Sequence, residues 1–179
     1  MIEKINECRT GYVLRNTAGG EVEVIFTHRI KTEYDQIEKE DLEQFAEILI
    51  ANANSKIRVV QSPAFSHYDA ICVTDNGVAH IELKRRSMKY ADGWMLEFDK
   101  YNDLLKLQNI TGIPSKYVTL YRTTAYSIDV TKVNELLENT LQWETVPCNR
   151  NTTEAPGEKK QKKVLFIPVE YWKTMLKYK

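Results

Sequence analysis

The chain has 179 residues, of which 42% are hydrophobic and 28% charged, enough for one globular core and too few to need two. Twenty-five basic residues balance twenty-five acidic ones, so the zero net charge excludes a general attraction to nucleic acid. We therefore expect a single domain over residues 1–179, in which any attraction to a polyanion is local.

The cysteines and the apolar runs indicate the cellular setting. Cys8, Cys72 and Cys148 are odd in number and widely spaced, which argues against a disulfide framework or a zinc ribbon. The first residues lack an apolar signal region, and no run approaches the roughly 20 apolar residues of a membrane span. We expect a cytoplasmic protein with no membrane partner.

Three elements are predicted in the first third of the chain. Residues 10–27 contain two strand-like runs joined through Ala18-Gly19-Gly20, which predicts a hairpin. Residues 33–54 predict a helix, and residues 56–61 a short strand. The helix prediction rests on apolar residues at helical spacing: Leu42, Phe45, Ala46, Leu49, Ile50 and Ala53. Residues 33–47 also hold seven acids against one lysine, which gives this helix an acidic face.

A second hairpin is predicted around Asp75-Asn76-Gly77, because Asn-Gly tolerates the positive φ angles of a type I′ turn. With Asn76 and Gly77 as the two loop residues, Asp69 lies opposite Lys84. Strand alternation then places residues 69, 71, 82 and 84 on one face of the sheet. A loop of three residues would move Asp69 to the other face.

The residue types on this face indicate a metal-dependent chemistry. Asp69 and Glu82 can hold Mg²⁺ through carboxylate oxygens, and the ion can polarise a phosphate and lower the pKa of an attacking water. Lys84 can stabilise the negative charge that develops on the phosphate. The competing interpretation is a surface strand with ordinary charges, since Glu-x-Lys is common on solvated strands.

The segment after Lys84 is basic. Arg85, Arg86 and Lys89 can neutralise phosphates, and Trp94 can stack on an unpaired base, unless this run is only a solvated loop. From Trp94 onward the apolar spacing predicts a second helix that ends near Gly112 and Pro114. Lys100 and Glu97 are the polar residues of this helix that are candidates for the functional site.

The remaining elements follow in chain order. Residues 117–121 predict a strand and residues 130–141 a helix, capped by Asp129 or Thr131. Residues 147–163 are polar and rich in turn-forming residues, and we expect a mobile basic loop whose lysines clamp a nucleic-acid backbone or are simply solvated. The last segment, 164–179, predicts a strand packed on the main sheet and a short helix.

Asp69, followed thirteen residues later by Glu82-Leu83-Lys84 across a tight turn and after an acidic helix, resembles the PD-(D/E)xK nuclease superfamily. The resemblance covers residues 38–121. It implies an α/β, restriction-endonuclease-like fold with a mixed central sheet flanked by α-helices. One departure is that Tyr68, not proline, precedes Asp69.

The resemblance also implies functional residues and partners. It makes Asp69 and Glu82 metal ligands for Mg²⁺, with Mn²⁺ as a substitute, and points Lys100 toward the scissile phosphate. For an additional helix ligand Glu43 fits best, with Glu40 and Glu47 as rivals. DNA is the implied substrate, and a phage setting, hence the host cytoplasm, is plausible for a small member of the superfamily.

Three interpretations remain open from the sequence, one of them an unrelated interaction protein in which the motif is accidental. The first is a metal-dependent nuclease that hydrolyses phosphodiester bonds. The alternative is a catalytically inactive nuclease-like fold that binds nucleic acid or protein. Endonuclease or exonuclease action, the form of the substrate and a possible homodimer are not encoded in any motif.

Overall fold

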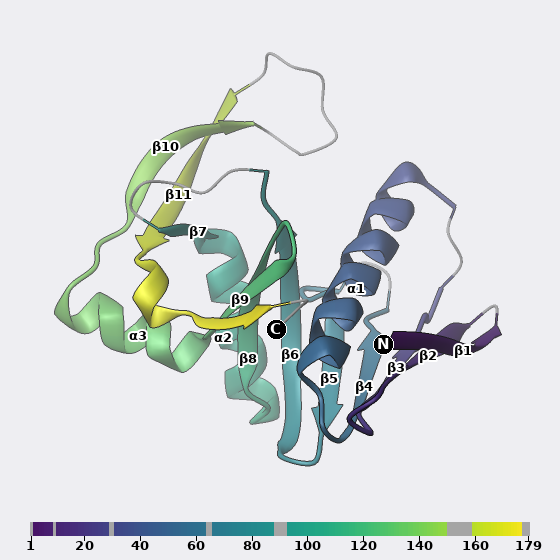
Figure 1. The fold of residues 1–179 in the computed structure, drawn as a ribbon. Helices are drawn as coiled ribbons and strands as arrows, with labels where there is room; N and C mark the ends of the chain where they lie inside the picture. Colours follow the sequence, from purple (N-terminus) through teal and green to yellow (C-terminus); the bar gives the residue numbers. More distant parts are fainter. Residues whose placement is uncertain are drawn as a thin grey trace.

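The computed structural model describes residues 2–8, 10–28, 31–63, 66–87, 93–149 and 159–176. A nine-stranded sheet dominates them (Figure 1). Strands β3 and β4 pair in parallel, as do β6 and β8, whereas the other neighbours are antiparallel. In spatial order the strands are β1 (Ile2–Cys8), β2 (Gly11–Asn16), β3 (Glu21–Ile25), β4 (Lys56–Gln61), β5 (Ala70–Thr74), β6 (Gly77–Arg85), β8 (Ser115–Tyr121), β9 (Thr124–Asp129) and β12 (Lys173–Leu176).

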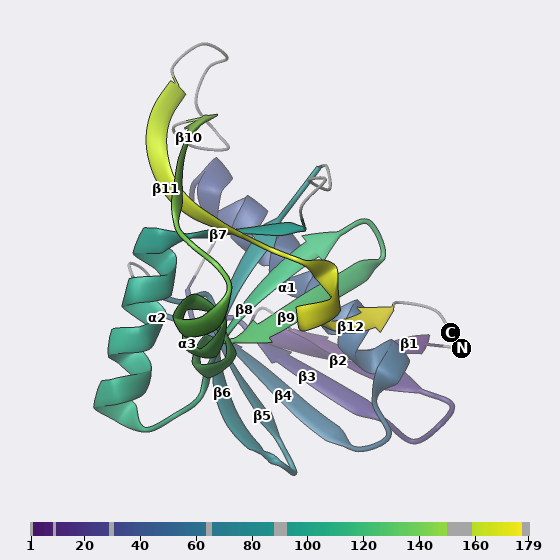
Figure 2. The same ribbon diagram turned by 90° about the vertical axis from the view of Figure 1, so that its left-hand side faces the viewer.

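Helices cover both faces of this sheet. α1 (Glu33–Asn52) lies on one face, and α2 (Phe98–Thr111) and α3 (Val130–Asn139) lie on the other (Figure 2). Strand β8 shows why, because alternate residues enter different cores: Val118 packs with α1, and Tyr117 packs with α2 and α3. The expected fold class, a mixed sheet flanked by helices, is confirmed.

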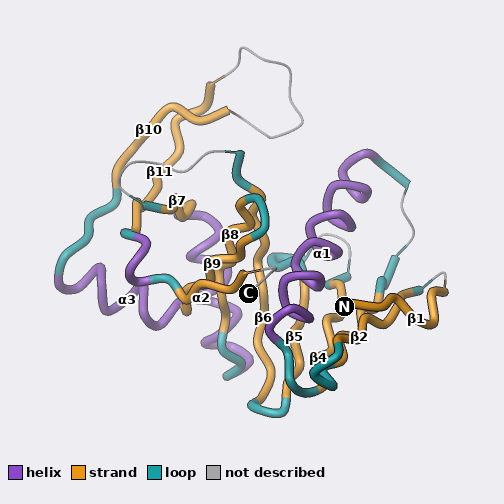
Figure 3. Tube along the Cα trace, viewed as in Figure 1, coloured by secondary structure: helices purple, strands orange, loops and turns teal. Residues whose placement is uncertain are grey.

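Most local predictions are confirmed. The hairpin at 10–27 forms β2 and β3, and the strands expected at 56–61 and 117–121 are β4 and β8. The first helix begins at Glu33 because Thr32 and Asp35 form a capping box: each side chain accepts a hydrogen bond from the other's backbone N–H. Helix, strands, second helix and strand follow in the order that the resemblance implies (Figure 3).

The second hairpin forms with a different turn. Thr74 pairs with Gly77, so Asp75 and Asn76 are the loop residues and the pairing is shifted by two residues from the prediction. The positive φ of 129° falls on Gly77, and the turn is not type I′. A shift of two preserves strand alternation, so residues 71, 82 and 84 remain on one face, whereas Asp69 lies just before β5 begins. Asp69 lies beside Ile81 rather than opposite Lys84, because its N–H donates to the Ile81 carbonyl.

The prediction was wrong for three segments that form a second sheet, in the order β10 (Glu144–Asn149), β11 (Lys159–Ile167), β7 (Trp94–Glu97). Residues 94–97 are strand, not helix, because β11 supplies their hydrogen bonds from about 70 positions later in the chain. The flanks of the expected loop at 147–163 pair with each other as strands, while residues 150–158 lie outside the described residues.

The C-terminal prediction was also wrong. The strand expected on the main sheet is β11 of the second sheet, and the expected helix is one turn of 3₁₀ helix (Val169–Tyr171) followed by strand β12. β12 pairs with β9 at the edge of the main sheet. No helix in the described parts of the chain is long and apolar enough to span a membrane.

Candidate active site

A cavity of about 360 Å³ opens where β6 ends, between α1 and α2. It collects charged residues from segments that are distant in sequence. The residues that line it are Tyr34, Ile37, Glu38 and Asp41 from α1, Asp69, residues 82–87 (Glu82, Leu83, Lys84, Arg85, Arg86 and Ser87), and Lys100 from α2. Asp69, Glu82, Lys84 and Lys100, which were predicted from the sequence, are therefore brought together.

Asp69 is held against β6 by its backbone and its side chain. Its N–H donates to the carbonyl of Ile81 over 2.9 Å, and its Oδ2 accepts a hydrogen bond from the N–H of Leu83 over 2.6 Å. Glu82 lies between these two contact points and is only 2% exposed. The β5–β6 hairpin thus fixes two carboxylates beside each other at the cavity.

Burial disfavours the ionised form of both carboxyl groups. Burial raises the pKa of Asp69, and burial together with Asp69 raises the pKa of Glu82 to about 8. Glu82 Oε2 is buried and has no hydrogen-bond partner among the described residues. An unpaired buried carboxylate oxygen is costly, so this site favours an additional cation.

Lys100 supplies part of the missing charge. Its Nζ lies 2.8 Å from Glu82 Oε1. Burial alone would lower the pKa of Lys100, but Glu82 and Asp69 together raise it above its ordinary value. The first turn of α2 therefore places a charged ammonium next to Glu82 Oε1, while Glu82 Oε2 has no partner among the described residues.

Lys84 lies beside the carboxylates and is oriented by Glu97. The two side chains approach to 4.0 Å between Nζ and Oε1, and Glu97 also pairs with Arg86 at 3.4 Å and Lys162 at 2.9 Å. Burial would raise the pKa of Glu97, but Lys84, Lys162 and Arg86 bring it below its ordinary value. Glu97, the last residue of β7, is thus ionised and links Lys84 to the second sheet.

The acids that α1 presents to the cavity are Glu38 and Asp41. Glu43 pairs with Lys39 at 3.6 Å and is not among the cavity-lining residues. Residues 34, 37, 38 and 41 recur at three and four positions and share one helix face, whereas Glu43 lies on another. Burial raises the pKa of Glu38, and it raises that of Asp41 to about 6.

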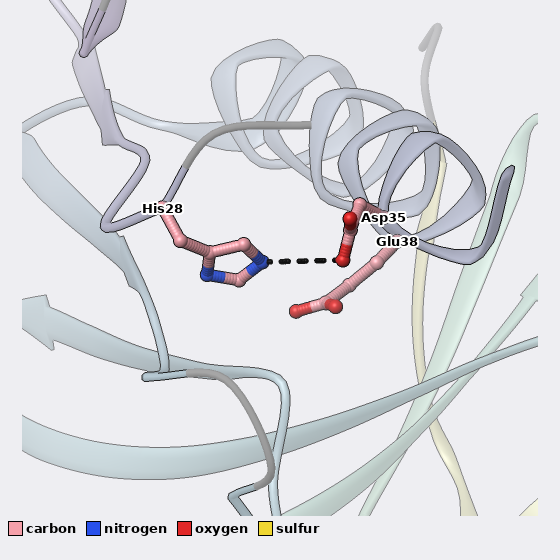
Figure 4. A group of neighbouring side chains, drawn as sticks. All are labelled: His28, Asp35 and Glu38. Atoms are coloured by element: carbon pink, nitrogen blue, oxygen red, sulfur yellow. Dashed lines mark ion pairs between the residues drawn. The ribbon is translucent and has the colours of Figure 1, made fainter. Parts of the chain in front are cut away.

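Glu38 also belongs to a neighbouring cluster with His28 and Asp35 (Figure 4). One donor atom from each lies within 4.8 Å of the others, and His28 Nε2 is 3.7 Å from Asp35 Oδ1. The amide of Gln61 bridges Glu38 and His28: its Nε2 lies 3.1 Å from Glu38 Oε1 and 3.3 Å from His28 Nε2. Hydrogen bonds therefore account for this cluster without an ion. Sequence analysis did not identify this cluster, because residues 28 and 61 come together only through the pairing of β3 with β4.

The basic run after Lys84 is mostly paired within the protein. Arg85 Nε lies 2.6 Å from Asp41 Oδ1, and its Nη1 lies 3.5 Å from Glu40 Oε2. Arg86 donates to the carbonyl of Met95 and to the hydroxyl of Tyr117, which leaves it 12% exposed. These contacts orient both guanidinium groups toward protein atoms. Lys89 lies outside the described residues.

Trp94 does not take the predicted stacking role. It is fully buried, with Tyr121 and Tyr126 against its ring at centroid distances of 5.2 and 4.8 Å. Because β7 pairs with β11 and packs Trp94 into the second core, the indole cannot reach a base without unfolding that core.

No protein-family model matches the chain, and no curated protein matches its sequence significantly. Among solved structures, the chain is similar to Hjc of Archaeoglobus fulgidus, a Holliday junction resolvase from an archaeal hyperthermophile. The two are 12% identical, the TM-score is 0.43, and the alignment covers 78% of this chain and 88% of the resolvase. A similarity of this size carries no argument about the activity of this chain.

Proposed function

We propose that this protein is a divalent-metal-dependent nuclease that hydrolyses phosphodiester bonds, with DNA as its substrate. The observation that carries the proposal is the buried Asp69–Glu82 pair, which faces an open cavity with one unpartnered oxygen and two lysines beside it. The DNA assignment rests on the resemblance of Asp69 and Glu82-Leu83-Lys84 to the PD-(D/E)xK motif.

The donor set fits a hard cation. The carboxylates that line the cavity belong to Glu38, Asp41, Asp69 and Glu82, and the cavity-lining residues include no histidine or cysteine. Oxygen ligands of this kind select Mg²⁺ or Mn²⁺. Asp69 and Glu82 would hold the ion, and Glu38 or Asp41 takes the place first proposed for Glu43. The bound ion supplies Lewis acidity toward the phosphate and a lower pKa for the attacking water.

The two lysines have different tasks in this proposal. Lys84, oriented by Glu97, donates hydrogen bonds to a phosphate oxygen and stabilises the charge that develops there. Lys100 holds Glu82 in place and lowers the pKa of that carboxyl, which favours the ionised form that binds a metal. A homodimer remains a prediction.

Cleavage assays test the proposal directly. Linear, circular, single-stranded and branched DNA, and RNA, are incubated with Mg²⁺ or Mn²⁺ and with EDTA. The variants are Asp69→Asn, which keeps an oxygen for the Leu83 N–H, and Lys84→Met, and the matched control is Lys132→Gln on the exposed face of α3.

We expect cleavage that needs the metal, is lost in both site variants and persists in the control. Cleavage that continues in Asp69→Asn would contradict the proposal. An absence of cleavage on every substrate, with binding retained, would instead support the nuclease-like binding module.

A further inference from the structure

Strands β10 and β11 form a two-stranded arm that projects from the body of the protein (Figures 1 and 2). We call residues 144–149 and 159–163 the β10–β11 arm. Strand β7 pairs with β11 along Val164–Ile167, whereas residues 159–163 pair with β10. The arm therefore continues beyond the three-stranded part of the second sheet.

The arm carries concentrated positive charge. Residues 159–163 include four lysines and no acid, and residues 144–149 contribute only Glu144 as a charged residue. Lys160 and Lys163 are exposed, and Lys162 is partly buried. Strand alternation places Lys160 and Lys162 on one face of the arm and Lys163 on the other.

The base of the arm is fixed next to the cavity. Lys162 Nζ lies 2.9 Å from Glu97 Oε2, while Glu97 Oε1 approaches the cavity-lining Lys84. On the opposite face, Lys163 Nζ lies 4.1 Å from the ring centre of Phe98 at the start of α2. These contacts give the arm a defined position relative to Lys84.

We propose that the β10–β11 arm binds the phosphate backbone of duplex DNA beside the cavity, an inference that rests on the proposed nuclease function. A two-stranded ribbon fits the major groove of B-DNA, which is about 12 Å wide. Lysines on its two faces then approach the two phosphate chains that border the groove. The major groove of duplex RNA is deep and narrow, so this geometry favours DNA.

Binding is measured without divalent metal, so that cleavage does not enter. The Asp69→Asn chain is titrated onto a fluorescent DNA duplex, and the anisotropy is followed at several salt concentrations. Lys160→Gln, Lys163→Gln and their combination are compared with the control pair Lys56→Gln and Lys132→Gln. The control lysines are exposed, lie outside the arm, and pair with Glu21 and Glu135 respectively.

Each arm substitution removes one phosphate contact. We expect the duplex affinity to fall roughly five- to tenfold per lysine at 0.1 M salt, and the salt-dependence slope to fall by about 0.9 per lysine. The control pair leaves both quantities unchanged. Circular dichroism verifies that the variants fold.

Two results would overturn the proposal: arm variants that bind duplex DNA as the control does, or a parent chain that does not bind duplex DNA. Cleavage by the chain with Asp69 intact is scored separately. If it cuts DNA but the arm variants bind normally, the arm proposal fails and the nuclease stands. If the arm variants lose affinity but no substrate is cut, the nuclease fails and the arm stands.

Discussion

Lys100 Nζ lies 2.8 Å from Glu82 Oε1, across the gap between α2 and β6. Glu82 is 2% exposed, and Lys100 is the cation that forms an ion pair with it among the described residues. Two residues that are 18 positions apart thus form one electrostatic unit at the floor of the cavity.

Removal of Lys100 should destabilise the metal-free protein. In Lys100→Met, the ionised Glu82 loses its partner, and we expect the free energy of unfolding to fall by about 2 kcal/mol at pH 9. At pH 6 the loss should be smaller, because Glu82 then keeps its proton. Urea unfolding in EDTA measures both values, with Lys132→Met as the control. An equal loss at both pH values would contradict the ion-pair explanation.

The raised pKa of Glu82 predicts how stability depends on pH. Its unfolded value is 4.5 and its folded value is about 8, so the folded state binds the proton more tightly. The stabilisation from that proton is complete below pH 4.5 and is lost as the pH rises through about 8.

In EDTA, the wild type should therefore lose stability between pH 5 and 9 more steeply than Glu82→Gln does. The comparison needs urea unfolding curves at several pH values. Parallel pH profiles would show that Glu82 does not carry the effect.

Variants of the α1 acids test which of them binds the metal: the structure points to Glu38 and Asp41, and the sequence pointed to Glu43. We expect Glu38→Gln or Asp41→Asn to weaken Mn²⁺ binding roughly tenfold, because their carboxylates line the cavity. Glu43→Gln should leave the affinity unchanged, since Glu43 pairs with Lys39 elsewhere on α1. Isothermal titration with Mn²⁺ tests all three, and a loss confined to Glu43→Gln would restore the original assignment.

Glu97 should act on cleavage through the position of Lys84. Glu97→Gln keeps one acceptor oxygen, replaces the other with an NH₂ donor, and removes the negative charge shared by Lys84, Arg86 and Lys162. We expect kcat to fall roughly tenfold with KM and Mn²⁺ affinity nearly constant, because a misplaced lysine affects the transition state most.

Single-turnover and steady-state kinetics measure the effects of Glu97→Gln on kcat and on KM separately. Glu135→Gln, on the exposed face of α3, is the matched control. A change in KM alone would indicate a role in substrate binding instead.

Local patterns in the sequence determined much of this site. The turn at 75–77 was sufficient to bring Asp69 near Glu82 and Lys84, and a register error of two residues left Glu82 and Lys84 on the same face of β6. The capping box and apolar spacing of α1 likewise determined where that helix begins. Each of these features depends on neighbours within a few residues or across one tight turn.

Tertiary structure decided the rest. Which acid of α1 faces the cavity depends on how the helix is rotated against the sheet, and the burial of Trp94 depends on pairing with β11, about 70 residues away. The conversion of an expected basic loop into the β10–β11 arm has the same origin. Long-range strand pairing and helix rotation are set by packing free energy, which the periodicity of a short segment does not contain.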